Sequence, residues 1–174
     1  MRLFEELLEA WRYTRAGVIA EAENLPESRF LERPVGVARS PLELVNHIVE
    51  SDRLMSGELS RADGDFRRKP YPELISEHLA PDDVAHSKSE AVERLRRSHA
   101  EGDAALRKAG AERLLEPIRQ FNGEHATKLT WMHHGVSHEE YHRGQLALYA
   151  RLFGEIPALT KLILGIDWRG VSRS

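Results

Sequence analysis

Apolar residues recur every three or four positions in four long segments of the chain, which is the spacing of one face of an α-helix. Between turn signals, no segment alternates apolar and polar residues at every second position, so no sheet is predicted. We expect long helices over residues 2–23, 41–60, 87–110 and 127–153, and a short helix over residues 73–79. The expected fold class is all-α.

Capping signals mark the starts of two of these helices. Ser40 precedes Pro41, which suits the first helical position, and the side chain of Glu43 can bond back to the backbone of Ser40. Ser87 and Glu90 repeat the Ser-x-x-Glu spacing before the next long helix. Both starts are therefore predicted to carry a capping box.

Four helices with one long crossover after residue 60 suggest a four-helix bundle, whose sites are built from inward side chains on facing helices. A chain of 174 residues has the usual size of one domain and can bury a core without disulfides. We expect residues 1–174 to form a single domain. Its core would cover about residues 2–159, with a C-terminal tail after it.

Three histidines are candidate metal ligands. Steps of four and three residues place His138 and His142 in one inward seam of the last helix, and His47 occupies a similar position on the second helix. Imidazoles buried together need a shared proton or metal, because each unsatisfied nitrogen costs roughly 1–3 kcal/mol. Residues four apart lie on the same side of a helix, so His138 and His142 can bind one ion, which His47 completes from across the bundle.

Spacing alone leaves other interpretations open. If the nine histidines were placed at random, roughly half a pair with a spacing of four residues would be expected, so one such pair is weak evidence. A hydrogen-bonded structural pair and an exposed polar face are therefore alternatives. The run from His138 to His142 also matches H-E-x-x-H, in which Glu139 would be the base of a metalloprotease. The extended form of that motif needs Gly and His where this chain has Gln145 and Leu148, and no sheet is expected to form a peptide cleft. A protease is therefore disfavoured.

The composition narrows the chemistry further. The chain has no cysteine, so thiolate ligands, thiol nucleophiles and disulfides are excluded, and nitrogen and oxygen must hold any metal. A net charge of −3 argues against sequence-independent binding of nucleic acid. The N-terminus is acidic and amphipathic, and no apolar run reaches the length of a membrane span. We expect a soluble, cytoplasmic protein with neither nucleic acid nor membrane as a partner.

Two motifs resemble those of the DinB/YfiT-like family of metal-binding helical bundles. One is the run LVNHI around His47, and the other is HEEYHRGQ from His138 to Gln145, followed by an end of the type FGEIP. The resemblance covers the chain from the first helix to about Leu159. It implies that the protein is a homodimer and that water or substrate takes the remaining coordination positions of a metal bound by His47, His138 and His142.

The resemblance also implies a function. Some relatives in this family are thiol-dependent S-transferases or isomerases that use bacillithiol or mycothiol. A divalent transition metal held by three neutral imidazoles keeps its charge and an open position, so it can activate a thiol or a water. With zinc or nickel as the cofactor, we expect a transferase that adds a low-molecular-weight thiol to an electrophilic small molecule. A metal-dependent hydrolase and a non-enzymatic stress-response protein are the alternatives.

Two glutamates are candidate catalytic bases beside the expected ligands. Glu50 follows His47 by one turn, and Glu139 follows His138 directly, although a solvated surface role is the alternative for Glu50. His134 lies one turn before His138 and is a candidate fourth ligand or a partner of a ligand. The remaining histidines are expected at the surface or in loops: His78, His86, His99, His125 and His133.

Overall fold

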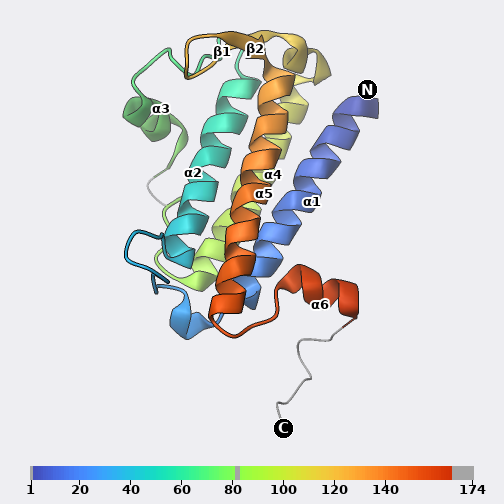
Figure 1. Ribbon diagram of the computed structural model, residues 1–174. Helices are drawn as coiled ribbons and strands as arrows, with labels where there is room; N and C mark the ends of the chain where they lie inside the picture. Colours follow the sequence, from blue (N-terminus) through green and yellow to red (C-terminus); the bar gives the residue numbers. More distant parts are fainter. Residues whose placement is uncertain (1, 81–82, 166–174) are drawn as a thin grey trace.

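Four long helices form a bundle in the computed structural model, which describes residues 2–80 and 83–165 (Figure 1). The long helices are α1 (Arg2–Asn24), α2 (Pro41–Ser60), α4 (Lys88–Ala109) and α5 (Lys128–Leu152). The connections and the C-terminal region carry α3 (Tyr71–His78), β1 (Pro117–Arg119), β2 (His125–Thr127) and α6 (Ala158–Leu164). Two short 3-10 segments are η1 (Glu27–Arg29) and η3 (Ala111–Leu115). The predicted all-α class and the four long helices are confirmed.

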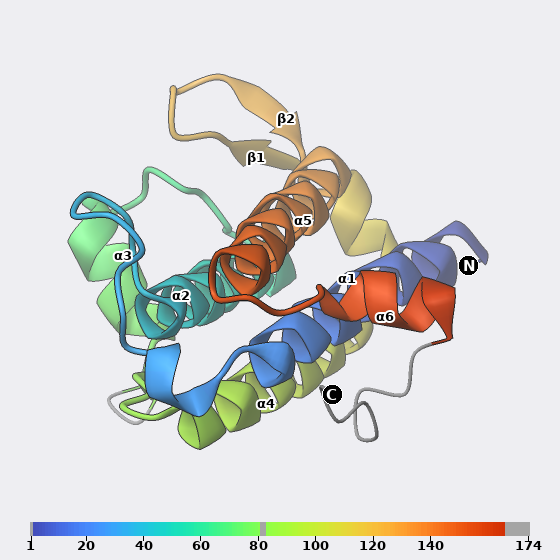
Figure 2. The same ribbon diagram turned by 60° about the horizontal axis from the view of Figure 1, so that its bottom comes forward.

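The bundle has a crossover topology. Both α1 and α2 pack along α4 and α5, so the first two helices of the chain occupy opposite corners. In Figure 1, α1 and α5 run downward while α2 and α4 run upward, and Figure 2 shows the four helices with the lower end of Figure 1 turned toward the viewer. Two neighbouring helices with the same direction need a connection that returns along the bundle. The segment between α2 and α4, which includes α3, is this predicted long crossover.

Two groups of buried apolar side chains fill the bundle, one around Phe30 and Ile48 and the other around Trp11 and Leu59. The helical spacing of α1 predicts one inward stripe with seven members: Leu3, Leu7, Ala10, Trp11, Thr14, Val18 and Ala22. Five of them are buried: Leu7, Trp11, Thr14, Val18 and Ala22. The prediction is wrong for Leu3, which is 81% exposed, and for Ala10, which is also exposed. The buried face of α1 therefore begins one turn later than its periodicity indicated.

Side-chain caps fix the starts of α2 and α4. Ser40 Oγ accepts the backbone N–H of Glu43 at 3.2 Å, and the Glu43 carboxylate accepts the backbone N–H of Ser40 at 2.7 Å, which completes the predicted capping box. At α4 only half of the predicted box forms. Ser87 Oγ accepts the N–H of Glu90 at 3.3 Å, but the Glu90 carboxylate accepts the N–H of His86 instead.

The expectation that the chain forms no sheet is wrong for one short hairpin. Strands β1 and β2 pair antiparallel, with Pro117 opposite Thr127. The connecting turn contains Asn122 and Gly123, and Gly123 has a φ of 94°, a value that favours glycine. Strands of three residues are too short to show a two-residue period, although Asn-Gly is a known hairpin signal.

The region expected as a C-terminal tail after residue 159 begins within α6, which packs against α1. The carboxylate of Glu21 on α1 accepts the backbone N–H groups of Ala158 and Leu159 at 2.9 and 3.2 Å, and so caps the first turn of α6. Residues 166–174 of the expected tail lie outside the described residues.

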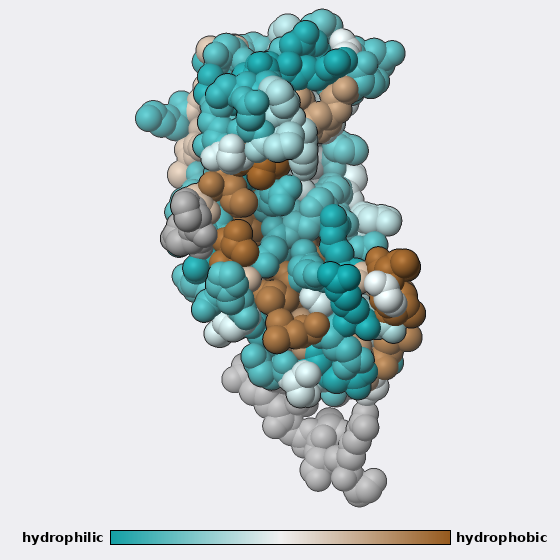
Figure 3. Space-filling model, turned by 90° about the vertical axis from the view of Figure 1, so that its left-hand side faces the viewer, coloured by the Kyte–Doolittle hydropathy of each residue, from teal (hydrophilic) through white to brown (hydrophobic). Residues whose placement is uncertain are grey.

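The surface on the side of α3 is mainly hydrophilic, and hydrophobic residues reach it in separate patches (Figure 3). The apolar faces of the long helices are instead buried in the bundle. Within residues 2–80 and 83–165, no helix has the length and apolar character that crossing a membrane requires.

Candidate metal centre

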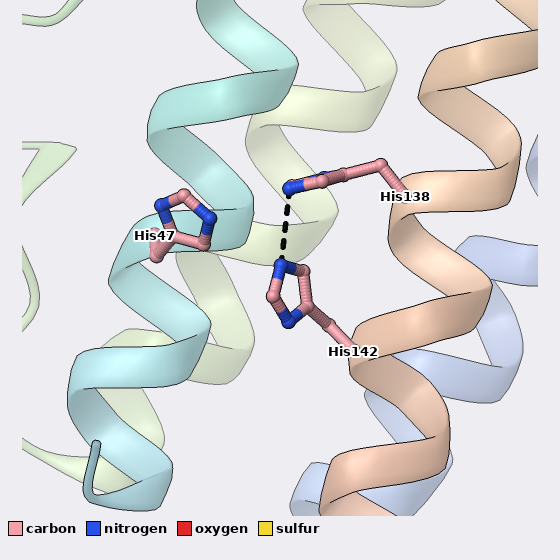
Figure 4. Close-up of side chains that lie close together, drawn as sticks. All are labelled: His47, His138 and His142. Atoms are coloured by element: carbon pink, nitrogen blue, oxygen red, sulfur yellow. Dashed lines mark hydrogen bonds between the residues drawn. The ribbon is translucent and has the colours of Figure 1, made fainter. Parts of the chain in front are cut away.

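Three imidazoles converge between α2 and α5 (Figure 4). The Nε2 atoms of His138 and His142 are 3.0 Å apart, and His47 faces both rings from α2, with ring centroids 5.2 and 4.9 Å away. One ring nitrogen from each histidine lies within 4.8 Å of the other two. Three imidazole nitrogens this close fit the ligand set of a single divalent transition metal.

The second ring nitrogen of His142 is engaged by Gln145, one turn further along α5. His142 Nδ1 lies 2.8 Å from Gln145 Oε1, and because an amide oxygen only accepts, the imidazole donates from Nδ1. A neutral ring that donates from Nδ1 keeps its lone pair on Nε2, which is the nitrogen that faces His138. Gln145 thus holds His142 in the tautomer that suits metal binding.

Two polar side chains hold the first half of α2 in position. Asn46, next to His47, donates to the carbonyl of Ala85 at 3.0 Å and accepts the N–H of the same residue at 2.9 Å. The hydroxyl of Tyr149 on α5 donates to the carbonyl of Arg39, at the end of the loop that leads into α2. These bonds fix the helix that carries His47 relative to its neighbours.

The surroundings of the three histidines favour neutral rings. Burial, the nearby imidazoles and the charge of Arg39 together lower the pKa of His47 and of His138 to about 4, although the charge of Glu139 opposes this shift at His138. Burial also lowers the pKa of His142. Neutral imidazoles present free lone pairs at pH 7, and this is the form that binds a metal.

A buried ion cluster crosses the bundle behind the histidines. Glu139 accepts from the indole N–H of Trp11 at 2.7 Å and from Arg15 at 2.7 and 2.8 Å. The third guanidinium nitrogen of Arg15, Nη1, donates to Ser98 Oγ at 2.9 Å, and Arg15 Nη2 lies 3.2 Å from Asp52 Oδ2. Each of the four long helices contributes a member to this cluster, which ties them together at one level of the bundle.

One guanidinium therefore faces two carboxylates in the interior. Burial raises the pKa of Asp52, and the charge of Glu139 adds to this increase, while Arg15 opposes it. Burial alone would lower the pKa of Arg15, but Glu139 and Asp52 raise it. Both oxygens of Glu139 accept hydrogen bonds within the cluster, so this carboxylate has a defined set of structural partners.

Glu50, the other predicted base, lies on α2 one turn after His47 and is half-buried. Its carboxylate accepts a hydrogen bond from the hydroxyl of Tyr71 at 3.3 Å. Burial raises the pKa of Tyr71, and the charge of Glu50 raises it further. This bond links Glu50 to the crossover, where Tyr71 begins α3.

A cavity of about 180 Å³ opens beside His47 and His138. Four aromatic side chains from the crossover, the hairpin and α5 line it: Phe66, Tyr71, Phe121 and Trp131. His134 also lines the cavity and packs against Trp131, with ring centroids 4.7 Å apart. The three-nitrogen cluster that the described residues form does not include His134.

The remaining histidines divide into two groups. His86, His125 and His133 are exposed, as predicted. The surface placement is wrong for His78, which lies 2.6 Å from the Glu58 carboxylate, and for His99, which packs against Trp11 with ring centroids 4.3 Å apart. Burial lowers the pKa of His99 to about 4.

The sequence interpretation missed the ion cluster and the aromatic wall of the cavity. The available sign of the cluster was a charged residue within an apolar stripe, since Arg15 follows Thr14 on the buried face of α1. Phe66 and Phe121 lie in polar connections without a helical period, so no pattern placed them together.

Comparison with known proteins gives a family and a fold. The sequence matches the model of the DinB superfamily over residues 10–146. No curated protein matches the sequence. Among solved structures, the DinB-like protein YjoA from Bacillus subtilis is 19% identical with a TM-score of 0.67, and the match covers 86% of this chain and 92% of that chain.

Two further structures are similar. YfiT from Bacillus subtilis, described as a probable metal-dependent hydrolase with an unusual four-helix bundle topology, is 14% identical with a TM-score of 0.67 over 87% of each chain. A mycothiol-dependent maleylpyruvate isomerase is 13% identical with a TM-score of 0.54, over 87% of this chain and 61% of that chain. At such identities the likeness shows the fold alone. The family match covers most of the sequence, and the chain belongs to the DinB superfamily.

Proposed function

We propose that this protein is a metal-dependent enzyme that transfers a low-molecular-weight thiol to an electrophilic small molecule. The observation that carries the proposal is the meeting of three ring nitrogens, from His47, His138 and His142, beside a cavity of small-molecule size. When bound there, a divalent transition metal would lower the pKa of a thiol or water that reaches it.

The protein's own residues suit a catalytic site more than a structural one. Structural zinc sites normally have four protein ligands, whereas catalytic sites have three and an open position. Here three imidazoles would hold the ion, and burial keeps them neutral, so the charge of the ion would not be cancelled. Gln145 would keep His142 Nε2 available. Zinc or nickel is the proposed metal.

The thiol is proposed as a co-substrate. The chain contains no cysteine, so a sulfur nucleophile must come from outside the protein. The similar isomerase is described as mycothiol-dependent, which supports a small thiol as the partner of this site. The cavity beside His47 and His138 gives the electrophile a place next to that thiol.

The two predicted bases receive different proposed roles. Glu50 is half-buried and accepts one bond from Tyr71, a residue of the cavity wall, so its carboxylate suits the transfer of a proton to or from the reactants. Glu139 has both oxygens engaged by Trp11 and Arg15. Its proposed contribution is to hold α5 in place behind the ligands.

Hydrolysis is the second candidate function. The description of YfiT as a probable metal-dependent hydrolase favours it, and the same three histidines would hold the metal. In that case water replaces the thiol, and Glu50 accepts a proton from it. The homodimer implied by the family resemblance and the cytoplasmic location expected from the sequence stay predictions.

A single assay separates the candidates. Zinc-loaded and nickel-loaded protein is incubated with 1-chloro-2,4-dinitrobenzene and with p-nitrophenyl acetate, each with and without a small thiol, and products are identified by mass spectrometry. A thioether that requires the thiol, the metal and His142 supports the transferase. Ester hydrolysis without thiol supports the hydrolase, and absence of both reactions contradicts an enzymatic role. His133→Ala is the control, because His133 is an exposed histidine on the same helix.

A further inference from the structure

Four aromatic rings form one part of the wall of the cavity beside the metal centre, and we call the part of the cavity lined by Phe66, Tyr71, Phe121 and Trp131 the aromatic pocket. The rings form a connected set. Phe66 lies 4.5 Å from Trp131 and 4.8 Å from Phe121 between ring centroids, and Phe121 lies 5.9 Å from Tyr71. These separations fall in the range of about 4.5–7 Å at which aromatic rings attract each other.

The inner and outer rings differ in exposure. Phe66 is 3% exposed, whereas Phe121 and Tyr71 are 44% and 47% exposed. Tyr71 begins α3 and Phe121 lies in the turn of the hairpin, so residues 50 positions apart in the sequence meet at the outer side of the pocket. Large apolar side chains that remain partly exposed around a hollow are typical of binding sites.

The size of the cavity sets the size of its occupant. A dry cavity of about 150 Å³ lined by apolar side chains accommodates benzene. The cavity here has about 180 Å³, which leaves room for one six-membered ring with a small substituent. A two-ring compound or a sugar with its hydration shell would extend out of the open side of the cavity.

The charges of the wall favour a neutral occupant. Of the residues that the structure shows lining the cavity, none is a lysine or an arginine, while Asp52 and Glu139 lie at its wall. Away from the metal centre, an anionic ligand would therefore meet no cationic side chain of the lining, and Arg15 is already paired with both carboxylates. The polar groups that do line the cavity include His47 and His138, so a substituent on the ring can point toward the metal centre.

We propose that the aromatic pocket binds an uncharged substrate with a single aromatic ring and places the substituent of that ring at the metal centre. This identification of the substrate class rests on the proposed function for the reaction, but binding of the ring itself needs no metal. The four rings supply flat surfaces on which an aromatic ligand stacks better than a saturated one of equal size.

Binding is tested with 4-fluorobenzyl alcohol as a neutral one-ring probe, followed by 19F NMR in the metal-free full-length protein. Unlabelled benzyl alcohol, cyclohexylmethanol and xylitol then compete for the site. We expect benzyl alcohol to displace the probe at a concentration about two- to tenfold lower than cyclohexylmethanol does, from the usual strength of aromatic pairs. Xylitol should not displace it. Equal competition by all three, or no binding of the probe, overturns the proposal.

Variants locate the probe. Phe121→Leu and Tyr71→Leu each remove one ring from a different segment while keeping an apolar side chain, and each should weaken binding by about fivefold. Leu148→Ala is the control, because Leu148 is 50% exposed on α5 and does not line the cavity. Unchanged affinity in both ring variants overturns the proposal.

The metal distinguishes this inference from the proposed function. Binding of the probe in the metal-free protein, combined with no turnover in the metal-loaded protein, refutes the proposed enzyme and retains the pocket. Turnover of aliphatic electrophiles without any binding of the aromatic probe refutes the aromatic pocket and retains the proposed enzyme.

Discussion

Gln145 Oε1 lies 2.8 Å from His142 Nδ1, on the side of the imidazole opposite to the nitrogen that faces His138. Because this bond sets the tautomer of His142, Gln145→Leu should weaken metal affinity by about 10- to 100-fold, the usual effect of losing such a partner. Competition with a chromogenic chelator measures the affinity. Gln145→Glu keeps an acceptor and should retain tight binding. Equal affinities of the wild type and the leucine variant would show that the bond has no effect on the metal.

The stability of the metal-free protein should fall in weakly acidic solution. The pKa values of His47 and His138 are about 4 in the folded protein, below the ordinary histidine value of 6.5. Between pH 6.5 and 4 the unfolded chain therefore binds protons that the folded chain does not, and the free energy of unfolding decreases as the pH falls. Urea unfolding at several pH values checks this. His47→Gln should show a shallower decrease, and an identical slope would contradict the account.

Removal of Glu139 should cost stability because it leaves Arg15 buried with an incomplete set of partners. Glu139→Ala is expected to lower the free energy of unfolding by about 3–5 kcal/mol, the range for breaking a buried ion pair. Glu140→Ala is the matched control, since Glu140 pairs with Arg143 near the surface. Its removal should lower the free energy of unfolding by about 1 kcal/mol or less. Urea unfolding measures both, and equal losses would count against a structural role of the cluster.

Glu50 should affect turnover without affecting the fold. Glu50 is the proposed proton acceptor, so the substitution Glu50→Gln should lower kcat by about 10²- to 10⁴-fold. The metal content and the free energy of unfolding should stay unchanged. Steady-state kinetics on the substrate identified by the thiol assay provide the measurement. Tyr71→Phe removes the hydroxyl that donates to Glu50 and should have a smaller effect. A fully active Glu50→Gln variant would exclude this role.

Close packing at Gly102 should make an added methyl group unfavourable. A Cβ atom there would lie 2.7 Å from Trp11 Cη2 and 3.0 Å from Ser56 Cβ. Gly102→Ala should therefore destabilise the protein by about 1–3 kcal/mol despite the better helix propensity of alanine. Gly144→Ala on α5, where a Cβ would meet nothing within 4 Å, should stabilise by up to about 1 kcal/mol. Thermal unfolding compares the two variants, and stabilisation by both would contradict the packing.

Local patterns predicted the long helices well because each pattern depends on residues close in sequence. The capping box of Ser40 and Glu43 spans only four residues and forms as predicted. His138 and His142 are one turn apart, so their shared face followed from helix geometry, and His47 followed from a similar position on the second helix and from its motif. The three histidines of the candidate site were therefore within reach of sequence reasoning.

Contacts between distant segments were not predictable in this way. Arg15 and Glu139 are 124 positions apart, and nothing in their local sequence shows that they form a buried pair. The pairing of Phe121 with Tyr71 depends on where the hairpin and the crossover meet. The Asn-Gly turn could have indicated the hairpin, but not that the hairpin would line a cavity.

Elemental analysis of the purified, untagged protein tests the central claim most directly. The wild type and the His133→Ala control should each carry about one transition-metal ion per chain after reconstitution with zinc or nickel, and the His138→Ala, His142→Ala double variant should carry none. A wild type without metal after reconstitution, or a double variant that keeps the full amount, would contradict a metal centre formed by these histidines.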